Sequence, residues 1–308
     1  MGKTSFTLEL AEEILNNKDY SGIDLISADS RQVYRGFEII SGADIPAEFK
    51  LNRGKKITYP FYSKERINLH GVSIVSPDEE WSVAHFQDLA LEVIKLAKQE
   101  NRLVIVIGGT GLYHDQLLNS NASLRVKPND DVRQKAEQMK LKDLQVWAKK
   151  ANPSRVAEMN NSDINNPRRL IRAIEIGLNQ AGKKYIYSAL NFEQIYIGLV
   201  QDLAKIEEKI RQRVLERFSD QSIPEVKQLQ EKYQDWSLPA FSALGVSEIG
   251  QYLNGLFSKE ECLSLWTLHE LQYARRQLTW WKNRDVAWFE IDNHKWKPTA
   301  FTYILNLC

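Results

Sequence analysis

The sequence has few of the residues that build disulfide-linked or metal-centred proteins. Its 308 residues include two cysteines, Cys262 and Cys308, which lie far apart and form no CxxC pair. Neither a disulfide framework nor a cysteine metal site is therefore predicted. The five histidines are scattered, without the close spacing of a zinc or iron site. We expect no structural metal and a reducing compartment, the cytoplasm.

Long apolar runs and an excess of one charge are also missing. No run approaches the roughly 20 residues that span a bilayer, and the first residues do not resemble an export signal. Lys and Arg together number 41 and Asp and Glu 40, which indicates neither a wholly basic nucleic-acid binder nor an acidic solvating chain. A site for a polyanion must therefore come from local clustering, and we expect no membrane association.

Several segments have the pattern of an α/β fold. Residues 24–28 and 103–107 are short apolar runs typical of buried parallel strands. Between them, apolar residues recur at helical spacing over residues 82–99, with Ser82 as the expected N-cap. Further strands are expected at 195–200 and 286–291, and a further helix at 203–218. The sequence predicts an α/β protein with a mostly parallel sheet.

A block without strand patterns interrupts this order. From residue 118 to 191 the pattern is helical throughout, with proline and asparagine breaks. We interpret it as an all-helical insertion at 118–191 in a core formed by residues 1–117 and 192–308.

The first residues carry a phosphate-binding pattern. Gly2, Lys3, Thr4 and Ser5 precede an apolar helical stripe and match the second half of a Walker A loop. There, backbone N–H groups and the helix dipole hold phosphate oxygens, the lysine neutralises charge and the hydroxyl reaches Mg²⁺. The strand and first glycine of a complete loop would precede these residues, so an exposed helix start is an equal alternative.

Two further polar segments follow predicted strands. SADSRQVYRG contains Asp29, a candidate general base or metal ligand, and GGTGLY contains Thr110 among glycines that admit an anion. Taken singly, each is explained by turn formation. Because the carboxyl ends of strands meet at the ligand crevice of such sheets, we expect the segments to converge.

These segments together resemble a known family. SADSRQVYRG, GGTGLY, NPRRLIRAIE at 166–175 and YARRQLTW at 273–280 are similar, in order and spacing, to the motifs of the tRNA dimethylallyltransferases. The resemblance covers nearly the whole chain. It implies a P-loop NTPase-like core with an incomplete P-loop, and transfer of a dimethylallyl group from its diphosphate to N6 of the adenosine beside the anticodon.

The resemblance also implies roles for individual residues. Asp29 would accept or orient the proton of the adenine amine, and Thr110 and Arg213 would contact the diphosphate. Gly2, Lys3, Thr4 and Ser5 would hold that diphosphate, with Mg²⁺ on Thr4. The positions expected beside tRNA are Ser30, Arg31, Gln32, Arg168, Arg169, Arg172, Arg275, Arg276 and Gln277. The implied partners are the tRNA anticodon stem-loop and dimethylallyl diphosphate, and we expect a monomer.

The chain departs from the family pattern at several positions. Residues 38–43 lack a glycine and a lysine of the family motif, and residues 245–247 and Lys209 also differ. Glu270 and Leu271 replace a Thr-Arg pair. Two alternatives therefore stay open: a P-loop kinase of a small metabolite, and a catalytically impaired relative that binds RNA.

Overall fold

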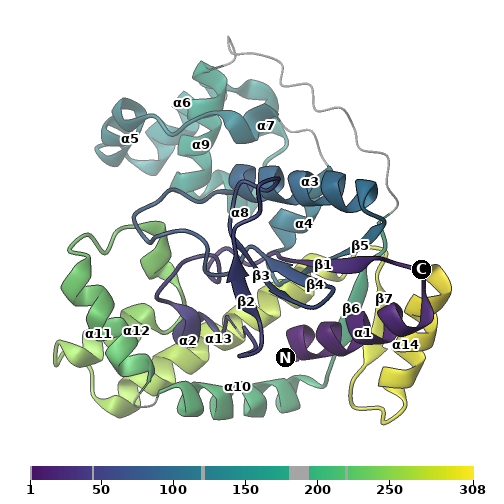
Figure 1. Cartoon of the computed structure of the whole chain (residues 1–308). Helices are drawn as coiled ribbons and strands as arrows, with labels where there is room; N and C mark the ends of the chain where they lie inside the picture. The colour runs from purple at the N-terminus through teal and green to yellow at the C-terminus, as the bar shows by residue number, and fades with distance from the viewer. Residues whose placement is uncertain (1, 44, 119–121, 180–193, 219–220) are drawn as a thin grey trace. The chain divides into compact units, whose positions relative to one another are not determined.

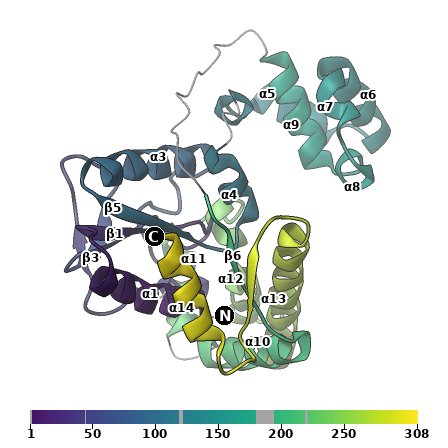
Figure 2. The same cartoon turned by 90° about the vertical axis from the view of Figure 1, so that its right-hand side faces the viewer.

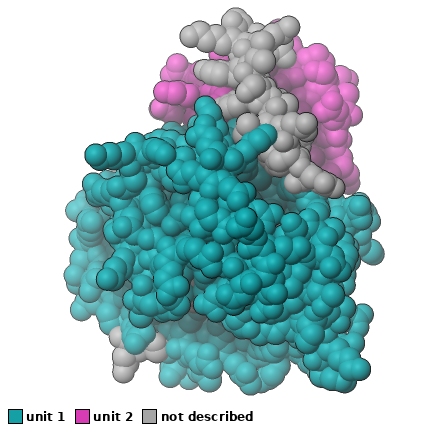
Figure 3. Space-filling model, turned by 45° about the vertical axis from the view of Figure 1, so that its right-hand side comes forward, with its two compact units in different colours: residues 1–117, 190–308 teal, residues 118–189 magenta. Residues whose placement is uncertain are grey.

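The chain forms two compact units. The computed structural model describes residues 2–43, 45–118, 122–179, 194–218 and 221–308. Unit 1 comprises residues 1–117 and 190–308, and unit 2 comprises residues 118–189 (Figure 3). Each unit is described by itself below.

Unit 1 combines a central sheet with helices on both faces (Figure 1). Its first half runs α1 (Lys3–Asn17), β1 (Gly22–Ser27), α2 (Glu38–Ser41), β2 (Lys50–Asn52), β3 (Phe61–Lys64), β4 (Ile67–His70), α3 (Val83–Gln99), β5 (Arg102–Ile107) and α4 (Gly111–Leu118). Its second half runs β6 (Ile197–Val200), α10 (Leu203–Arg217), α11 (Ser222–Lys232), the 3₁₀ turn η2 (Pro239–Ser242), α12 (Val246–Leu253), α13 (Lys259–Trp281), β7 (Ala287–Glu290) and α14 (Trp296–Leu307).

Strand β1 lies inside a five-stranded sheet of order β2-β3-β4-β1-β5. It pairs in parallel with β5, Ile23 opposite Leu103, and with β4 on its other side. The two strands predicted from apolar runs, the helix predicted at 82–99 and the α/β fold class are therefore confirmed. The strands predicted in the second half are also confirmed: β6 and β7 form a parallel pair of their own.

The segment from residue 50 to 70 was not predicted as part of the sheet. There β3 and β4 form an antiparallel hairpin, and β2 adds to β3. These strands are three or four residues long. Strands β2 and β3 are partly exposed, and the mostly buried β4 alternates apolar and polar residues, so none has the continuous apolar run that marks a buried strand. The expectation of a mostly parallel sheet therefore holds for β1, β4 and β5 and is wrong for this edge.

Two apolar cores cover the sheet, because alternate side chains of β1 point to opposite faces. Ile26 and Phe86 belong to the core that packs α3 onto β1 and continues into α10–α13. Ile23 and Leu25 belong to the other core, with α1 and α14. The rings of Phe6 and Trp296 lie 5.1 Å apart and join these two helices, which run side by side in Figure 2.

Strand β1 contains a buried charge cluster. Asp24 is 4% exposed and accepts hydrogen bonds from Asn68 Nδ2 at 2.8 Å and from Arg102 Nε at 2.7 Å. His70 Nε2 lies 2.9 Å from Asp24 Oδ1 and donates, since a carboxylate only accepts. Burial alone would raise the pKa of Asp24, but these hydrogen bonds outweigh it and lower the pKa.

Unit 2 is helical in its described part. It contains η1 (Ala122–Arg125), α5 (Asp130–Glu137), α6 (Leu141–Ala151), α7 (Pro153–Ala157), α8 (Asn161–Ile164) and α9 (Pro167–Leu178). Side chains of Asn129, Asn152, Asn160 and Asn166 accept backbone N–H groups and begin α5, α7, α8 and α9. The asparagine and proline positions that suggested breaks are thus helix starts. The predicted segment 180–191 lies outside the described residues.

None of the helices in the ranges given above combines the length and apolarity that crossing a membrane requires.

Candidate active site

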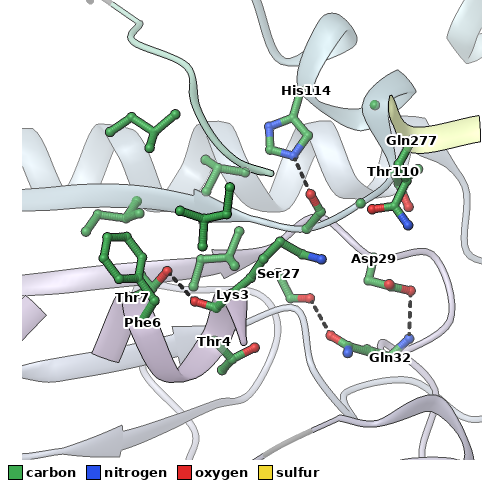
Figure 4. A pocket seen from close by; sticks show the side chains of 18 of the residues that line it. Lys3, Thr4, Phe6, Thr7, Ser27, Asp29, Gln32, Thr110, His114 and Gln277 are labelled. Carbon is green, nitrogen blue, oxygen red and sulfur yellow. Dashed lines mark hydrogen bonds between the residues drawn. The ribbon is translucent and has the colours of Figure 1, made fainter. Parts of the chain in front are cut away.

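Unit 1 contains a large cavity where the polar segments after β1 and β5 meet the start of α1. Its volume is about 1730 Å³, more than the roughly 300–1000 Å³ of common ligand pockets. Part of this space lies between β5 and β6, whose apolar side chains line it. Lys3, Asp29 and Thr110 all face it (Figure 4). The predicted convergence of these three residues is therefore observed.

The amino end of α1 opens onto the cavity. Gly2 has φ of 86°, a left-handed conformation that favours glycine, and its carbonyl accepts the Phe6 N–H at 3.0 Å. The helix thus begins at Lys3, and Lys3, Thr4 and Ser5 line the cavity. The first N–H groups of a helix have no partner within it and carry partial positive charge. The arrangement suits an anion.

The Lys3 side chain lines the cavity and is accessible to solvent there. Partial desolvation by the surrounding protein lowers the pKa of the Lys3 amine, while the Asp29 carboxylate acts in the opposite direction. Arg213 and Glu270 also act on this amine, in opposite directions. An anion placed between Lys3 and Arg213 would therefore meet these two cations and the two carboxylates of Asp29 and Glu270.

Asp29 is oriented by the turn that follows β1. Its Oδ1 accepts the backbone N–H of Arg31 at 2.8 Å and of Gln32 at 3.3 Å. The interpretation of Asp29 as a turn residue is thus correct for this oxygen. The same bonds hold the carboxylate at the cavity wall, which leaves the residue available for chemistry at its other oxygen.

The neighbours of Asp29 are fixed by longer-range bonds. Gln32 accepts from Ser27 Oγ at 3.1 Å and donates from Nε2 to the Gly42 carbonyl at 2.8 Å, which ties the turn to the end of α2. Arg31 donates from its guanidinium to the Pro239 carbonyl at 2.7 Å. Ser30, Arg31 and Gln32 all line the cavity.

The glycines after β5 permit close packing at the cavity rim. A Cβ on Gly108 would lie 2.2 Å from the Ala28 carbonyl oxygen, and one on Gly109 would lie 2.4 Å from the side chain of Gln277. The turn therefore fits between the end of β1 and α13. Thr110 donates its N–H to the Ala28 carbonyl at 3.2 Å, and its side chain is hydrogen-bonded to Tyr273.

An aromatic group lines the cavity beside this turn. His114 Nε2 lies 3.4 Å from the Gly108 carbonyl, and its ring is 5.3 Å from Trp281 and 6.5 Å from Tyr196. Burial lowers the pKa of His114 to about 4, so its ring is neutral near pH 7. Neither His114 nor Tyr273 was predicted as a site residue, although both stand inside or beside the quoted motifs.

Arg213 reaches the cavity from α10, and its guanidinium is paired with Glu270 of α13. The distance from Arg213 Nη2 to Glu270 Oε2 is 2.8 Å, and Glu270 is 7% exposed. The ion pair therefore holds the Arg213 guanidinium at the cavity. The pairing itself was not predicted, although Glu270 stands where the chain departs from the family pattern.

One arginine of α13 also lines the cavity. Arg275 and Arg276 lie on this helix, and Arg276 and Gln277 line the cavity. The Arg276 guanidinium lies 5.8 Å from the centre of the Tyr273 ring, and Arg284 lies 4.8 Å from the Trp280 ring. These groups offer charge beside flat aromatic surfaces.

In unit 2 the three arginines of α9 differ in their surroundings. Arg172 donates to the carbonyls of Ser123 and Val126 at 2.9 and 2.8 Å and pairs with the buried Glu175. Arg169 pairs with Asp163, and Arg168 is exposed. Arg172 therefore holds unit 2 together, a role that its spacing with Arg168 did not predict.

Comparison with known proteins places the chain in a family. The family model described as IPP transferase matches residues 32–284, which is more than half of the chain. The chain belongs to the IPP transferase family. This is the family that the motifs indicated. The matched range includes Thr110 and Arg213 and begins shortly after Asp29.

Curated relatives of this IPP transferase family member match over almost its full length. A tRNA dimethylallyltransferase of Alkaliphilus oremlandii is 33% identical, over 96% of this chain and 89% of the relative. One of Halothermothrix orenii is 30% identical, over 96% of this chain and 86% of the relative.

Solved structures of family members are also similar. A tRNA isopentenylpyrophosphate transferase from Bacillus halodurans has 29% identity and a TM-score of 0.65, covering 99% of this chain and 91% of that one. A eukaryotic dimethylallyltransferase acting on tRNA has a TM-score of 0.72 at 20% identity, covering 99% and 77%, and supports the fold alone.

Proposed function

We propose that this chain transfers a dimethylallyl group from dimethylallyl diphosphate to the exocyclic N6 of the adenosine beside the anticodon of tRNA. The observation that carries the proposal is the convergence of Lys3, Asp29 and Thr110 on one cavity, in a member of the IPP transferase family. Its relatives at 30% identity or more are named tRNA dimethylallyltransferases.

The start of α1 would hold the diphosphate leaving group. When the bond between the allylic carbon and the diphosphate oxygen breaks, negative charge develops on that oxygen. The Lys3 amine, the N–H groups at the start of α1 and the Thr110 hydroxyl offer charge and donors at this place. Removing one preorganised donor of this kind typically costs about 3–4 kcal/mol of barrier.

Asp29 would take the proton. The adenine N6 attacks the allylic carbon, and the new C–N bond leaves one proton too many on nitrogen. The Asp29 carboxylate, held by the N–H groups of Arg31 and Gln32, is positioned to accept it. Positioned bases of this kind typically contribute about 10²–10⁴-fold in rate.

The cavity residues are chemically suited to Mg²⁺. This ion prefers oxygen ligands and commonly binds through one or two protein oxygens together with substrate phosphates. The Thr4 hydroxyl and Asp29 carboxylate are such groups, whereas no cluster of three His, Cys, Asp or Glu occurs among the described residues. We propose Thr4 as the protein ligand; the bound ion would neutralise charge on the departing diphosphate.

The tRNA would be held by charge and stacking. Single-stranded bases are commonly read by stacking on aromatic or guanidinium planes, as Trp280 and Arg284 would allow. Arg172 is the least suited to phosphates, because its guanidinium already makes three hydrogen bonds within unit 2. The other polar groups proposed to contact tRNA are Ser30, Arg31, Gln32, Arg276 and Gln277 in the cavity lining, Arg275 beside them, and Arg168 and Arg169 of unit 2.

Transfer of a label tests the proposal. Purified protein is mixed with labelled dimethylallyl diphosphate, Mg²⁺ and an anticodon stem-loop, and the RNA is digested and analysed by mass spectrometry. We expect label on the N6 of the adenosine beside the anticodon, and none on a stem-loop with guanosine there. Phosphate transfer from ATP to a small molecule, or salt-sensitive RNA binding without transfer, would refute the proposal.

A further inference from the structure

We propose that Glu270 masks Arg213 and so weakens the binding of diphosphate, a role in product release that rests on the proposed function of the cavity. The inference rests on the ion pair between Arg213, which lies at a cavity suited to phosphate, and the nearly buried carboxylate of Glu270. Glu270 Oε2 accepts from Arg213 Nη2 at 2.8 Å, and both residues line the cavity that Lys3 faces.

Glu270 is one of few acidic residues in a cavity lining that is mainly basic. Among the described residues, the acidic side chains in the lining are those of Asp29 and Glu270. Asp29 is bonded to the turn after β1 through one oxygen, whereas Glu270 is paired with an arginine that would otherwise face an incoming anion. The basic residues of the lining are Lys3, Arg31, Lys98, Arg102, Arg213, Arg217 and Arg276.

Arg213 retains the capacity to bind a second acceptor. Its Nε is buried and has no hydrogen-bond partner among the described residues. A guanidinium has five N–H donors in a fixed fork, and two of them suit a phosphate in a bidentate contact. The hydrogen bond to Glu270 comes from Nη2. Because Nε is buried, a phosphate oxygen would bind it only after the guanidinium turned toward the cavity.

An anion that binds between Lys3 and Arg213 must therefore compete with a carboxylate already in place. The Lys3 amine is close enough to Arg213 and Glu270 for both to change its pKa, so the three charges belong to one local field. Removing the carboxylate charge adds one net positive charge to this field. The side chains of Arg213 and Glu270 are only 29% and 9% exposed, so the attraction for an anion increases more than it would at an open surface.

The consequence for the reaction concerns the product. A diphosphate held by all available cations leaves slowly, and product release limits many enzymes. With Glu270 returning to Arg213, the released diphosphate loses one of its partners. Glu270 thus lowers the affinity of the protein for diphosphate and makes its release faster.

The test measures binding of inorganic diphosphate to the full chain by calorimetry, without Mg²⁺ and without RNA. We expect Glu270→Gln, which keeps the shape and removes the charge, to lower the Kd by about tenfold or more, equivalent to about 1.4 kcal/mol. Arg213→Ala alone removes one positive charge and leaves the Glu270 carboxylate unpaired at the cavity, so it should raise the Kd by about tenfold or more. In the double variant Arg213→Ala/Glu270→Gln, the gain in affinity over the wild type should disappear.

A matched control comes from a neighbouring pair of helices. Glu248 of α12 is 5% exposed and pairs with His269 of α13, but it does not line the cavity. Glu248→Gln removes an equally buried carboxylate and should leave diphosphate binding unchanged. If Glu270→Gln does not fold, Glu270→Thr is measured instead, with the same expectations.

The outcomes separate this inference from the proposed function. An unchanged Kd in the Glu270 variants, or a gain that persists without Arg213, would overturn the masking role. A chain that transfers no prenyl group to RNA but shows the full pattern of Kd changes would refute the proposed function and leave the masking role standing.

Discussion

Strand β1 contains one aspartate, Asp24, and is followed two residues beyond its end by another, Asp29. Asp24 is buried and bonded to side chains of Asn68, His70 and Arg102. Asp29 is held through one oxygen by two backbone N–H groups and faces a cavity. The first carboxylate is saturated by protein, and the second keeps an oxygen for a ligand. The difference separates a structural charge from a candidate catalytic one.

The strongest expected effect is on the reaction at Asp29. Asp29→Asn keeps an oxygen that can accept the N–H groups of the turn but cannot take a proton at neutral pH. We expect the single-turnover rate of prenyl transfer to fall by about 10²–10⁴-fold, with thermal stability little changed. A variant that retains the full rate would remove Asp29 from the mechanism.

A large effect on stability, and little on chemistry, is expected at Asp24. Asp24→Asn leaves the Arg102 guanidinium without its carboxylate partner. Breaking a buried pair in this way typically costs about 3–5 kcal/mol, and we expect the free energy of unfolding in urea to fall by about 3 kcal/mol. A loss below about 1 kcal/mol would show that the cluster is better solvated than its burial indicates.

A smaller loss of stability is expected when the close packing at Gly108 is disturbed. Gly108→Ala would bring a Cβ against the Ala28 backbone, so β1 and the turn after β5 would have to separate. Overpacking of this kind typically costs about 1–3 kcal/mol, and we expect a loss in that range in urea unfolding. Ser30→Ala, in the neighbouring turn, is the control and should lose less than about 0.5 kcal/mol. Equal stability of both variants would contradict the tight packing of this turn.

The smallest expected effect is on how the free energy of unfolding depends on pH. Because the folded-state pKa of Asp24 is lowered, its contribution to stability is present above its unfolded pKa of about 3.9. That contribution is lost as the pH falls through the folded pKa. The wild type should therefore lose more stability than Asp24→Asn between neutral pH and the acid range, measured by urea unfolding at several pH values. Parallel pH profiles would contradict the assignment.

The sequence predicted those features of the fold and the site that follow from continuous patterns of residues. The apolar runs of β1 and β5 identified two neighbouring strands, and the rule that polar strand ends share one edge correctly brought Asp29 and Thr110 together. The motifs also indicated the family that the comparisons identify. The roles assigned to individual site residues stay predictions.

What escaped prediction depends on contacts between distant segments. Arg213 and Glu270 lie 57 positions apart, and their ion pair follows from the packing of α10 on α13. Arg172 turns toward the carbonyls of Ser123 and Val126, which its helical spacing with Arg168 does not reveal. The short strands between residues 50 and 70 are stabilised by their pairing and carry little apolar pattern of their own.

One side-by-side measurement tests the contrast between the two aspartates most directly. The single-turnover rate of prenyl transfer to an anticodon stem-loop is compared for Asp24→Asn and Asp29→Asn, at a temperature at which circular dichroism shows both variants folded. We predict that Asp24→Asn stays within about threefold of the wild type, while Asp29→Asn is slower by about 100-fold or more. Equal losses in the two variants would contradict the contrast.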